Sequence, residues 1–204
     1  MGNYSISYIL IVIVCILISL VIHEFMHAYA GYKLGDRTAH EQGRLTLNPL
    51  SHIDPVMTLL LPVATLLIFG APILAAKPVP FDPRNVKYDE FGAALIAAVG
   101  PFTNLVLAFL AAMVARFSGL NIEAGATFLG IFIVINVAIF VFNMIPIPPL
   151  DGSRVLYAFA PEPVQRFMEN IEPFGFFIII LLVISGGLSG VLVNINTFVL
   201  NLLV

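Results

Sequence analysis

The sequence ISYILIVIVCILISLVI, residues 6–22, is followed directly by HEFMH, residues 23–27. The first stretch is apolar enough to predict a helix buried in a membrane. Residues four apart share one face of a helix, so His23 and His27 can bind one metal ion while Glu24 lies beside it. Ionisable side chains are costly in a membrane helix, and they indicate a functional site.

A less specific explanation exists for each of these side chains. Two histidines in an apolar helix can be core residues whose ring nitrogens are satisfied by hydrogen bonds, and Glu24 can be the buried partner of a basic group. No Lys or Arg lies within one turn of Glu24 along this helix, however. Three ionisable groups at this spacing therefore favour a metal site with an adjacent carboxylate.

The composition predicts a protein that is embedded in a lipid bilayer. The chain has 204 residues, of which 60% are hydrophobic and 10% are charged, whereas soluble domains carry about 25% charged residues. At this length we expect one membrane-embedded domain, residues 1–204. The net charge of −3 gives no indication of a nucleic-acid partner. The lone cysteine, Cys15, excludes an intrachain disulfide and is expected to be a core thiol.

Five apolar segments can be compared with the ~20 residues that cross a bilayer. They lie near residues 8–30, 56–75, 91–117, 124–145 and 174–203. We expect an all-α, multi-span membrane protein, a helical bundle with its metal site within the bilayer. The last segment is too long for one straight span. Gly186, Gly187 and Gly190 offer a break, so one kinked span and a hairpin both stay open.

The second apolar segment, residues 56–75, is predicted to be re-entrant. Pro62, Gly70 and Pro72 suit a broken path that is buried against other helices. If this segment crossed the membrane, the basic residues would divide four against five between the two sides. If it enters and leaves on one face, eight of nine lie on one side and only Arg116 lies opposite. The positive-inside rule then makes the shared side cytoplasmic and puts the N-terminus outside.

A third metal ligand has to come from elsewhere in the chain, since catalytic zinc usually takes three protein ligands and keeps one position for water. The most unusual carboxylate is Asp151, which follows the apolar segment 124–145 and a proline-rich turn. The prolines end the helix and present Asp151 near the membrane boundary. Chemistry alone leaves two roles open, that of a metal ligand and that of the cap of a short helix beginning near Gly152.

Several ordered motifs make the chain resemble a known family. They are HEFMH at 23–27, LNPLSHIDP at 47–55, AKPVP at 76–80, GPFTN at 100–104 and NMIPIPPLDG at 143–152. Together they resemble the site-2 protease family of intramembrane zinc metalloproteases, in its small prokaryotic branch without accessory domains. The resemblance covers nearly the whole chain. One departure is Ser153, where many relatives have a second glycine after the aspartate.

The resemblance implies a zinc site and the residues that form it. His23, His27 and Asp151 would hold one Zn2+ per chain, and Glu24 would take up and deliver the proton. Asn143 would face the active site, where its amide can donate to the substrate carbonyl as that oxygen gains negative charge. A hydrogen bond between helices is the other role open to Asn143.

The expected activity is hydrolysis of peptide bonds in membrane-embedded protein substrates. The protein would be a multi-pass protein of the cell membrane, with its active site open toward the cytoplasm. Its partners would be a transmembrane protein substrate and the lipid bilayer, and no nucleic acid is expected. Whether the protein forms a homo-oligomer is a question that the sequence leaves open. The alternative is a membrane metal transporter or metal sensor that uses the same histidine pair. Transporters often contain inverted repeats, and this sequence shows no repeat.

Three further features receive structural interpretations. Gly100 and Asn104 share a helix face, which favours close helix approach over substrate contact. His52 is expected to order its loop through a hydrogen bond. Residues 77–80 predict an extended strip, which is either a surface loop or the neighbour of a substrate strand.

Overall fold

The computed structural model describes residues 5–52, 79–119 and 127–203, and every regular element in these ranges is a helix. The α-helices are α1 (Ile6–Lys33), α2 (Thr38–Glu41), α4 (Asp89–Phe117), α5 (Phe128–Asn143), α6 (Asp151–Phe159), α7 (Glu162–Ile171), α8 (Gly175–Ile184) and α9 (Ser189–Leu203). Short 3-10 helices cover Pro49–Ser51, Pro83–Asn85 and Glu172–Phe174. The all-α prediction is confirmed for this part of the chain.

Helix α1 has the properties of a membrane helix. It begins at a cap, because the side chain of Ser5 accepts a hydrogen bond from the Tyr8 backbone N–H. Over the described residues, α1 and α4 are the two helices that are long and apolar enough to cross a bilayer. Large apolar side chains along the N-terminal half of α1 are exposed, among them Ile6, Leu10 and Ile13. A surface of this kind suits lipid contact.

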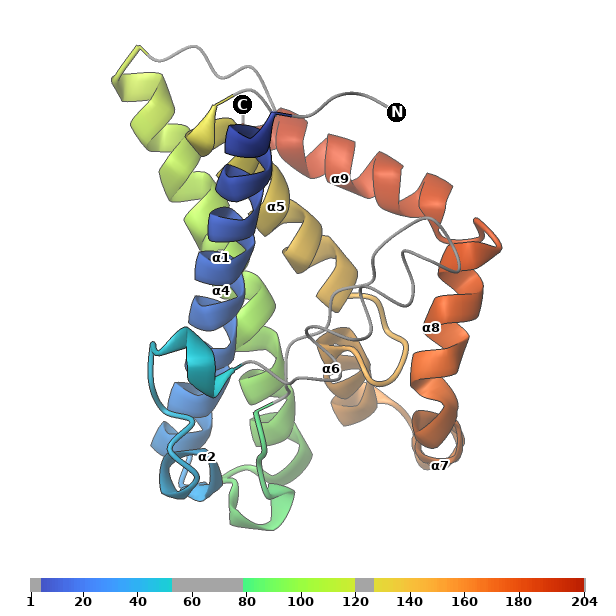
Figure 1. Ribbon diagram of the computed structural model, residues 1–204. Helices are drawn as coiled ribbons and strands as arrows, with labels where there is room; N and C mark the ends of the chain where they lie inside the picture. The colour runs from blue at the N-terminus through green and yellow to red at the C-terminus, as the bar shows by residue number, and fades with distance from the viewer. Residues whose placement is uncertain (1–4, 53–78, 120–126, 204) are drawn as a thin grey trace.

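Helices α1, α4 and α5 pack together and form the core (Figure 1). A buried cluster joins α4 to α5, and its members are Ala108, Ala111, Ala112, Ile133, Val137 and Val141. The alanines of α4 let the two backbones approach closely, which is the usual device where helices associate in lipid. This close approach brings polar side chains of three helices within hydrogen-bonding distance of one another.

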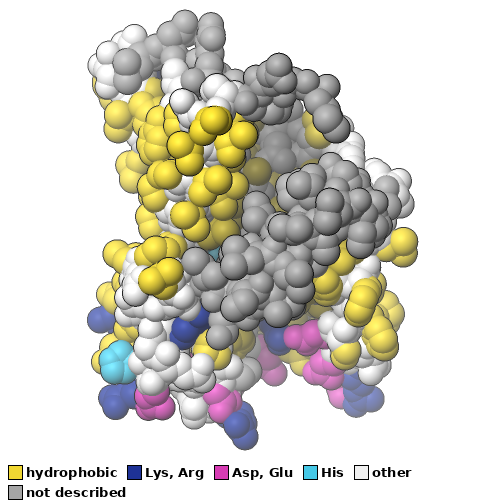
Figure 2. All heavy atoms as spheres, viewed as in Figure 1, with side chains coloured by type: hydrophobic (Ala, Val, Ile, Leu, Met, Phe, Trp, Pro, Cys, Tyr) yellow, Lys and Arg dark blue, Asp and Glu magenta, His cyan; other side chains and the backbone are white. Residues whose placement is uncertain are grey.

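The end of α1 and the start of α4 lie at the same end of the molecule. The Lys87 backbone N–H donates to the Leu34 carbonyl at 2.9 Å, just before α4 begins and just after α1 ends. Charged side chains gather at this end, around α2 and α7, whereas hydrophobic side chains cover α1 beyond it (Figure 2). The predicted re-entrant segment, residues 56–75, lies outside the described residues and stays a prediction.

The apolar segment 174–203 forms two helices and not one. Helix α8 ends at Ile184 and α9 begins at Ser189. Gly186 lies between them with a φ of 72°, a left-handed conformation that glycine adopts without steric cost. In Figure 1, α9 runs on toward the end of the molecule where α1 begins, and it does not fold back along α8. The structure therefore favours the kinked path over a hairpin.

Candidate metal centre

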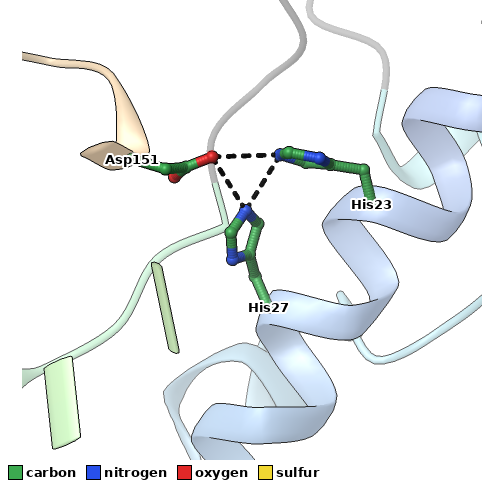
Figure 3. A group of neighbouring side chains, drawn as sticks. All are labelled: His23, His27 and Asp151. Carbon is green, nitrogen blue, oxygen red and sulfur yellow. Dashed lines mark hydrogen bonds and ion pairs between the residues drawn. The ribbon is translucent and has the colours of Figure 1, made fainter. Parts of the chain in front are cut away.

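Two imidazole rings of α1 and one carboxylate of α6 converge on a single point (Figure 3). The Nε2 atoms of His23 and His27 lie 2.9 Å apart. Oδ2 of Asp151 lies 3.2 Å from the first of these nitrogens and 3.4 Å from the second. Both rings are buried, at 4% and 7% exposure. The structure thus brings together the two histidines that the sequence predicted as metal ligands and the aspartate that the resemblance implied as the third.

The second nitrogen of each ring is held by an acceptor. Nδ1 of His23 lies 2.6 Å from Oδ1 of Asn104, and Nδ1 of His27 lies 2.7 Å from the Ile96 carbonyl oxygen. A carbonyl oxygen only accepts, so both Nδ1 atoms must donate. In a neutral imidazole the other nitrogen then carries a lone pair. Both lone pairs therefore point at the place where the rings and the Asp151 carboxylate meet.

This arrangement fits a divalent cation such as zinc. With both rings neutral and no cation bound, three acceptor atoms would face one another in a buried space, which is unfavourable. Zinc–nitrogen and zinc–oxygen distances of about 2.0–2.2 Å place the ligand atoms of a tetrahedral site roughly 3.3 Å apart. The three separations found here are 2.9, 3.2 and 3.4 Å. Two histidines and one carboxylate also form a donor set that is typical of catalytic zinc.

The turn between α5 and α6 presents Asp151 to the histidines. The chain leaves α5 at Asn143, passes through a proline-rich turn with a cis Pro148–Pro149 bond, and begins α6 at Asp151. Leu150 is the N-cap residue of α6, and its apolar side chain makes no capping hydrogen bond. Of the two roles that chemistry left open, the geometry therefore supports the metal ligand, because the carboxylate faces the imidazoles.

Glycine at position 100 makes room for the two rings. A Cβ atom added at Gly100 would lie 2.3 Å from Nε2 of His27 and 3.0 Å from Cε1 of His23. The first of these distances is far below van der Waals contact. The expected close approach at Gly100 is present, but its main partners are the imidazoles of the metal centre.

Glu24 lies beside the two histidines on α1 and is 7% exposed. Its Oε2 accepts a hydrogen bond from the Val79 backbone N–H at 3.2 Å. The loop that contains Val79 is anchored a few residues further on, where the Asp82 N–H donates to the buried carboxylate of Asp36 at 3.0 Å. The Arg84 guanidinium beside Asp82 holds the pKa of that carboxyl below its usual value.

A cavity of about 820 Å³ opens beside the metal centre. The three candidate ligands and Glu24 line it, together with apolar side chains of α1, α4 and α5. Its size is in the range of ligand-binding cavities in proteins. Arg154 and Glu172, which form an ion pair, also line it. The metal centre therefore faces a largely apolar space with a few charged groups.

Asn143 lines the same cavity, as the resemblance implied. Its Nδ2 donates to the Ile139 carbonyl of its own helix at 3.0 Å. The amide is therefore near the metal centre but is bonded within α5. Asn196 of α9 also lines the cavity, with a buried Oδ1 that has no hydrogen-bond partner among the described residues. Sequence reasoning missed Asn196, although an amide in an apolar helix is a signal that could have indicated it.

The remaining predicted residues have structural roles. Nε2 of His52 lies 2.8 Å from the Thr46 carbonyl oxygen, so its expected loop-ordering hydrogen bond is confirmed. His40 is exposed, and its ring lies near Tyr32 and away from the metal centre. Cys15 is fully buried and free, as expected of a core thiol. Of the strip 77–80, residues 77 and 78 lie outside the described ranges.

Comparison with known proteins gives concordant results. The model of peptidase family M50 matches residues 119–185, which contain Asn143 and Asp151. A protein of Bacillus subtilis named "Putative zinc metalloprotease YwhC" is 36% identical over 195 residues, which cover 89% of this chain and 84% of that protein.

More distant relatives have names of the same kind. A Mycolicibacterium smegmatis protein named "Putative zinc metalloprotease Rip2" is 32% identical, over 85% of this chain and 66% of its own length. A Methanocaldococcus jannaschii protein named "Putative zinc metalloprotease MJ0611" is 31% identical, over 76% of this chain and 73% of its own. No solved structure matches the chain.

Proposed function

Because this chain belongs to peptidase family M50, the site-2 proteases, we propose that it is a zinc metalloprotease that cleaves membrane-embedded protein substrates. The observation that carries this function is the meeting of two Nε2 atoms and one carboxylate oxygen beside a buried glutamate. His23, His27 and Asp151 are the residues that would hold one Zn2+ ion. The ion, when bound, polarises carbonyl groups and lowers the pKa of water from 15.7 to about 7.

Glu24 is the general base and general acid of this mechanism. Its carboxylate is buried in the cavity wall, so it can take a proton from a water molecule that attacks the scissile carbonyl. The same carboxyl group then delivers that proton to the leaving amine. Each bond of the reaction is accounted for in this way: a C–O bond forms, the C–N bond breaks, and the proton moves from water to nitrogen.

Asn143 is the residue we assign to the developing oxyanion. It lines the cavity that holds Asp151, and its amide can turn from the Ile139 carbonyl to donate to the substrate oxygen. Donors that bind the oxyanion more tightly than the ground-state carbonyl lower the barrier of the chemical step. The bond to Ile139 keeps the amide satisfied while no substrate is present.

The substrate must be extended before it can be cut, because an intact helix hides its peptide bonds. Val79 and Phe81 line the cavity next to Glu24, and the N–H of Val79 already points at the carboxylate. We assign to this strip the position beside a substrate strand, whose backbone groups need hydrogen-bond partners in an apolar space.

The protein is a membrane protein, and its topology is part of the proposal. The helices α1, α4, α5 and the pair α8–α9 span the bilayer, residues 56–75 form a re-entrant segment, and the whole chain is one domain. The end with Lys33 and Lys87 faces the cytoplasm. The hydrogen bond from the Lys87 N–H to the Leu34 carbonyl supports this topology, because it holds together two residues that flank the segment on either side.

Metal analysis of the purified protein together with a cleavage assay tests this function. The assay uses a membrane-embedded substrate and compares wild type with Glu24→Gln and Asp151→Ala. A protease keeps its zinc and loses cleavage in the first variant, and it loses zinc in the second. A metal transporter, the alternative reading, would still move ions across vesicle membranes in the Glu24 variant, and that result would overturn the proposal.

A further inference from the structure

A chain of three buried polar side chains leads from α5 through α4 to the metal centre. Ser19 of α1, Asn104 of α4 and Asn136 of α5 are each 0% exposed. Buried amides in apolar helices are costly unless both their donors and their acceptors are satisfied. Each hydrogen of the two amides has an acceptor, and the resulting order of donors and acceptors ends at His23.

The hydrogen bonds of Asn136 determine which groups donate and which accept along this series of side chains. Its Nδ2 donates to the Phe132 carbonyl of its own helix at 2.9 Å and to Oγ of Ser19 at 2.8 Å. Ser19 uses its own hydrogen on the Cys15 carbonyl at 2.7 Å, so its oxygen is free to accept. Both amide hydrogens of Asn136 are therefore in use, and its Oδ1 is left as an acceptor.

Asn104 continues the same order of donors and acceptors from Asn136 toward His23. Its Nδ2 donates to Oδ1 of Asn136 at 2.8 Å and to the Ser19 backbone carbonyl at 3.3 Å. Its Oδ1 then faces Nδ1 of His23 at 2.6 Å. An amide oxygen cannot donate, so the proton of this short hydrogen bond belongs to the imidazole.

We propose that Asn136 and Asn104 are positioning residues of the metal centre, which fix the ring orientation of His23 and leave its Nε2 as the metal-binding nitrogen. The proposal rests on the proposed function only in taking His23 as a ligand. Hydrogen bonds to the outer nitrogen of a metal-binding histidine typically change metal affinity by about 10- to 100-fold.

The two histidines are held by different means. Nδ1 of His27 donates to the Ile96 backbone carbonyl, which no side-chain substitution removes. Nδ1 of His23 depends on the side chain of Asn104, and through it on Asn136. Changes in this chain of amides should therefore act on the Nδ1 hydrogen bond of His23 and leave that of His27 in place, so Nδ1 of His27 serves as an internal reference in the same molecule.

Asn104 and Asn136 are neutral, and a neutral group suits a buried position next to the proposed metal site. The centre already contains one carboxylate, Asp151, and a neutral amide orients His23 without adding a second buried charge. A leucine of similar size would preserve the packing of α4 against α5 but remove the acceptor. An aspartate at 104 would keep the acceptor for His23 and lose the donor to Asn136.

The experiment measures zinc affinity of the full chain in detergent micelles by competition with a chelator. We expect Asn104→Leu to bind zinc about 10- to 100-fold more weakly and Asn136→Leu to show a smaller loss in the same direction. Asn104→Asp should recover most of the loss. The matched control is Thr103→Val, because the Thr103 hydroxyl donates to the Val99 carbonyl of its own helix and to no ligand of the proposed site. The zinc affinity of this variant should equal that of wild type.

A second readout reports on the ring itself. In the zinc-free protein with 15N-labelled histidine, NMR should show His23 protonated at Nδ1 in wild type and a mixture of both tautomers in Asn104→Leu, with His27 unchanged. Wild-type His23 protonated at Nε2 but not at Nδ1 would overturn the proposal, even if the leucine variants fail to fold. Equal zinc affinity in wild type and a folded Asn104→Leu would overturn it as well. A wild-type protein that binds zinc as described but cuts no substrate would instead refute the proposed function.

Discussion

The Val79 backbone N–H donates to the Glu24 carboxylate, with 3.2 Å between nitrogen and Oε2. This bond connects the loop before α4 to the functional face of α1, and the two residues are 55 positions apart in sequence. A buried carboxylate without a hydrogen-bond donor would be costly in this apolar setting. The donor is a main-chain group, so the position of Glu24 does not depend on the side chain at residue 79.

Glu24→Gln should abolish proton transfer and preserve the structure. The glutamine oxygen can still accept from Val79, whereas the amide is no base at neutral pH. We expect the cleavage rate to fall by about 10²- to 10⁴-fold with one zinc per chain retained. Rate and zinc content are measured on the same preparation. Glu41→Gln, at an exposed position of α2, is the matched control and should behave as wild type. Cleavage at the wild-type rate in the Glu24 variant would exclude the assigned role.

Gly100→Ala should displace the imidazoles. The new methyl group would lie 2.3 Å from Nε2 of His27, so a ring or the helix pair has to move. We expect a large loss of zinc affinity and of activity, measured by chelator competition and by cleavage. The control is Gly31→Ala on α1, where the added Cβ would meet, within the described part of the chain, Ile96 Cδ1 alone at an ordinary 3.8 Å. Normal zinc binding by the Gly100 variant would contradict the observed contact.

The half of the site on α1 could be predicted from sequence, because its determinants are local. Two histidines four residues apart share a helix face whatever the rest of the chain does. The cost of ionisable groups in an apolar helix is equally local. Asp151 is different: chemistry left ligand and cap open, and the resemblance to a family was needed to favour the ligand. The prolines predicted a turn between α5 and α6, and this turn brings the Asp151 carboxylate close to the two histidines.

The support around the site could not be predicted, because it depends on how three helices pack. Asn104 lies 81 positions from His23 and 32 from Asn136, and no sequence spacing relates them. The sequence assigned Gly100 to helix packing, but its neighbours are the imidazole rings. Asn136 was the one sign of this support in the sequence, since an amide inside an apolar helix needs a buried hydrogen-bond partner. The break between α8 and α9, by contrast, lies at the glycines that predicted it.

Asp151→Ala should lower zinc affinity and remove zinc-dependent stabilisation. In wild type, zinc at about 100 times its Kd should raise the free energy of unfolding by about 2.7 kcal/mol, measured as a higher melting temperature in detergent. The variant should show little of this shift at the same zinc concentration. Asp151 also lies in the first turn of α6, where a negative charge favours the helix. Glu162→Ala in the first turn of α7 controls for that effect and should leave the zinc-dependent shift intact.

Asn143→Leu should reduce cleavage and leave zinc binding unchanged. Loss of one oxyanion donor typically lowers kcat by about 10²- to 10³-fold, and the side chain of Asn143 bonds to Ile139 and not to a metal ligand. The comparison needs kcat and KM separately, because a donor specific to the transition state affects kcat. Asn194→Leu, at an exposed position of α9, is the control. An unchanged kcat in the Asn143 variant would exclude the oxyanion role and leave the hydrogen bond to the Ile139 carbonyl of its own helix as the described role of this amide.

The two ends of α4 should label from opposite sides of the membrane. Lys33 and Lys87 lie at the end where Lys87 bonds to Leu34, whereas Arg116 lies in the last turn of α4. With 29 residues, this helix is about 43 Å long, which exceeds the apolar thickness of a bilayer. All three side chains are exposed.

Single cysteines at these three positions, in a Cys15→Ala background, are treated with a membrane-impermeant thiol reagent. In intact cells only the Arg116→Cys protein should react. In inverted vesicles the Lys33→Cys and Lys87→Cys proteins should react and the Arg116→Cys protein should not. Reaction of Lys33→Cys and Lys87→Cys from opposite sides would contradict both the re-entrant segment and the common end of α1 and α4. Reaction of both from outside the cell would keep the architecture and reverse its orientation, since only the positive-inside rule assigns that end to the cytoplasm.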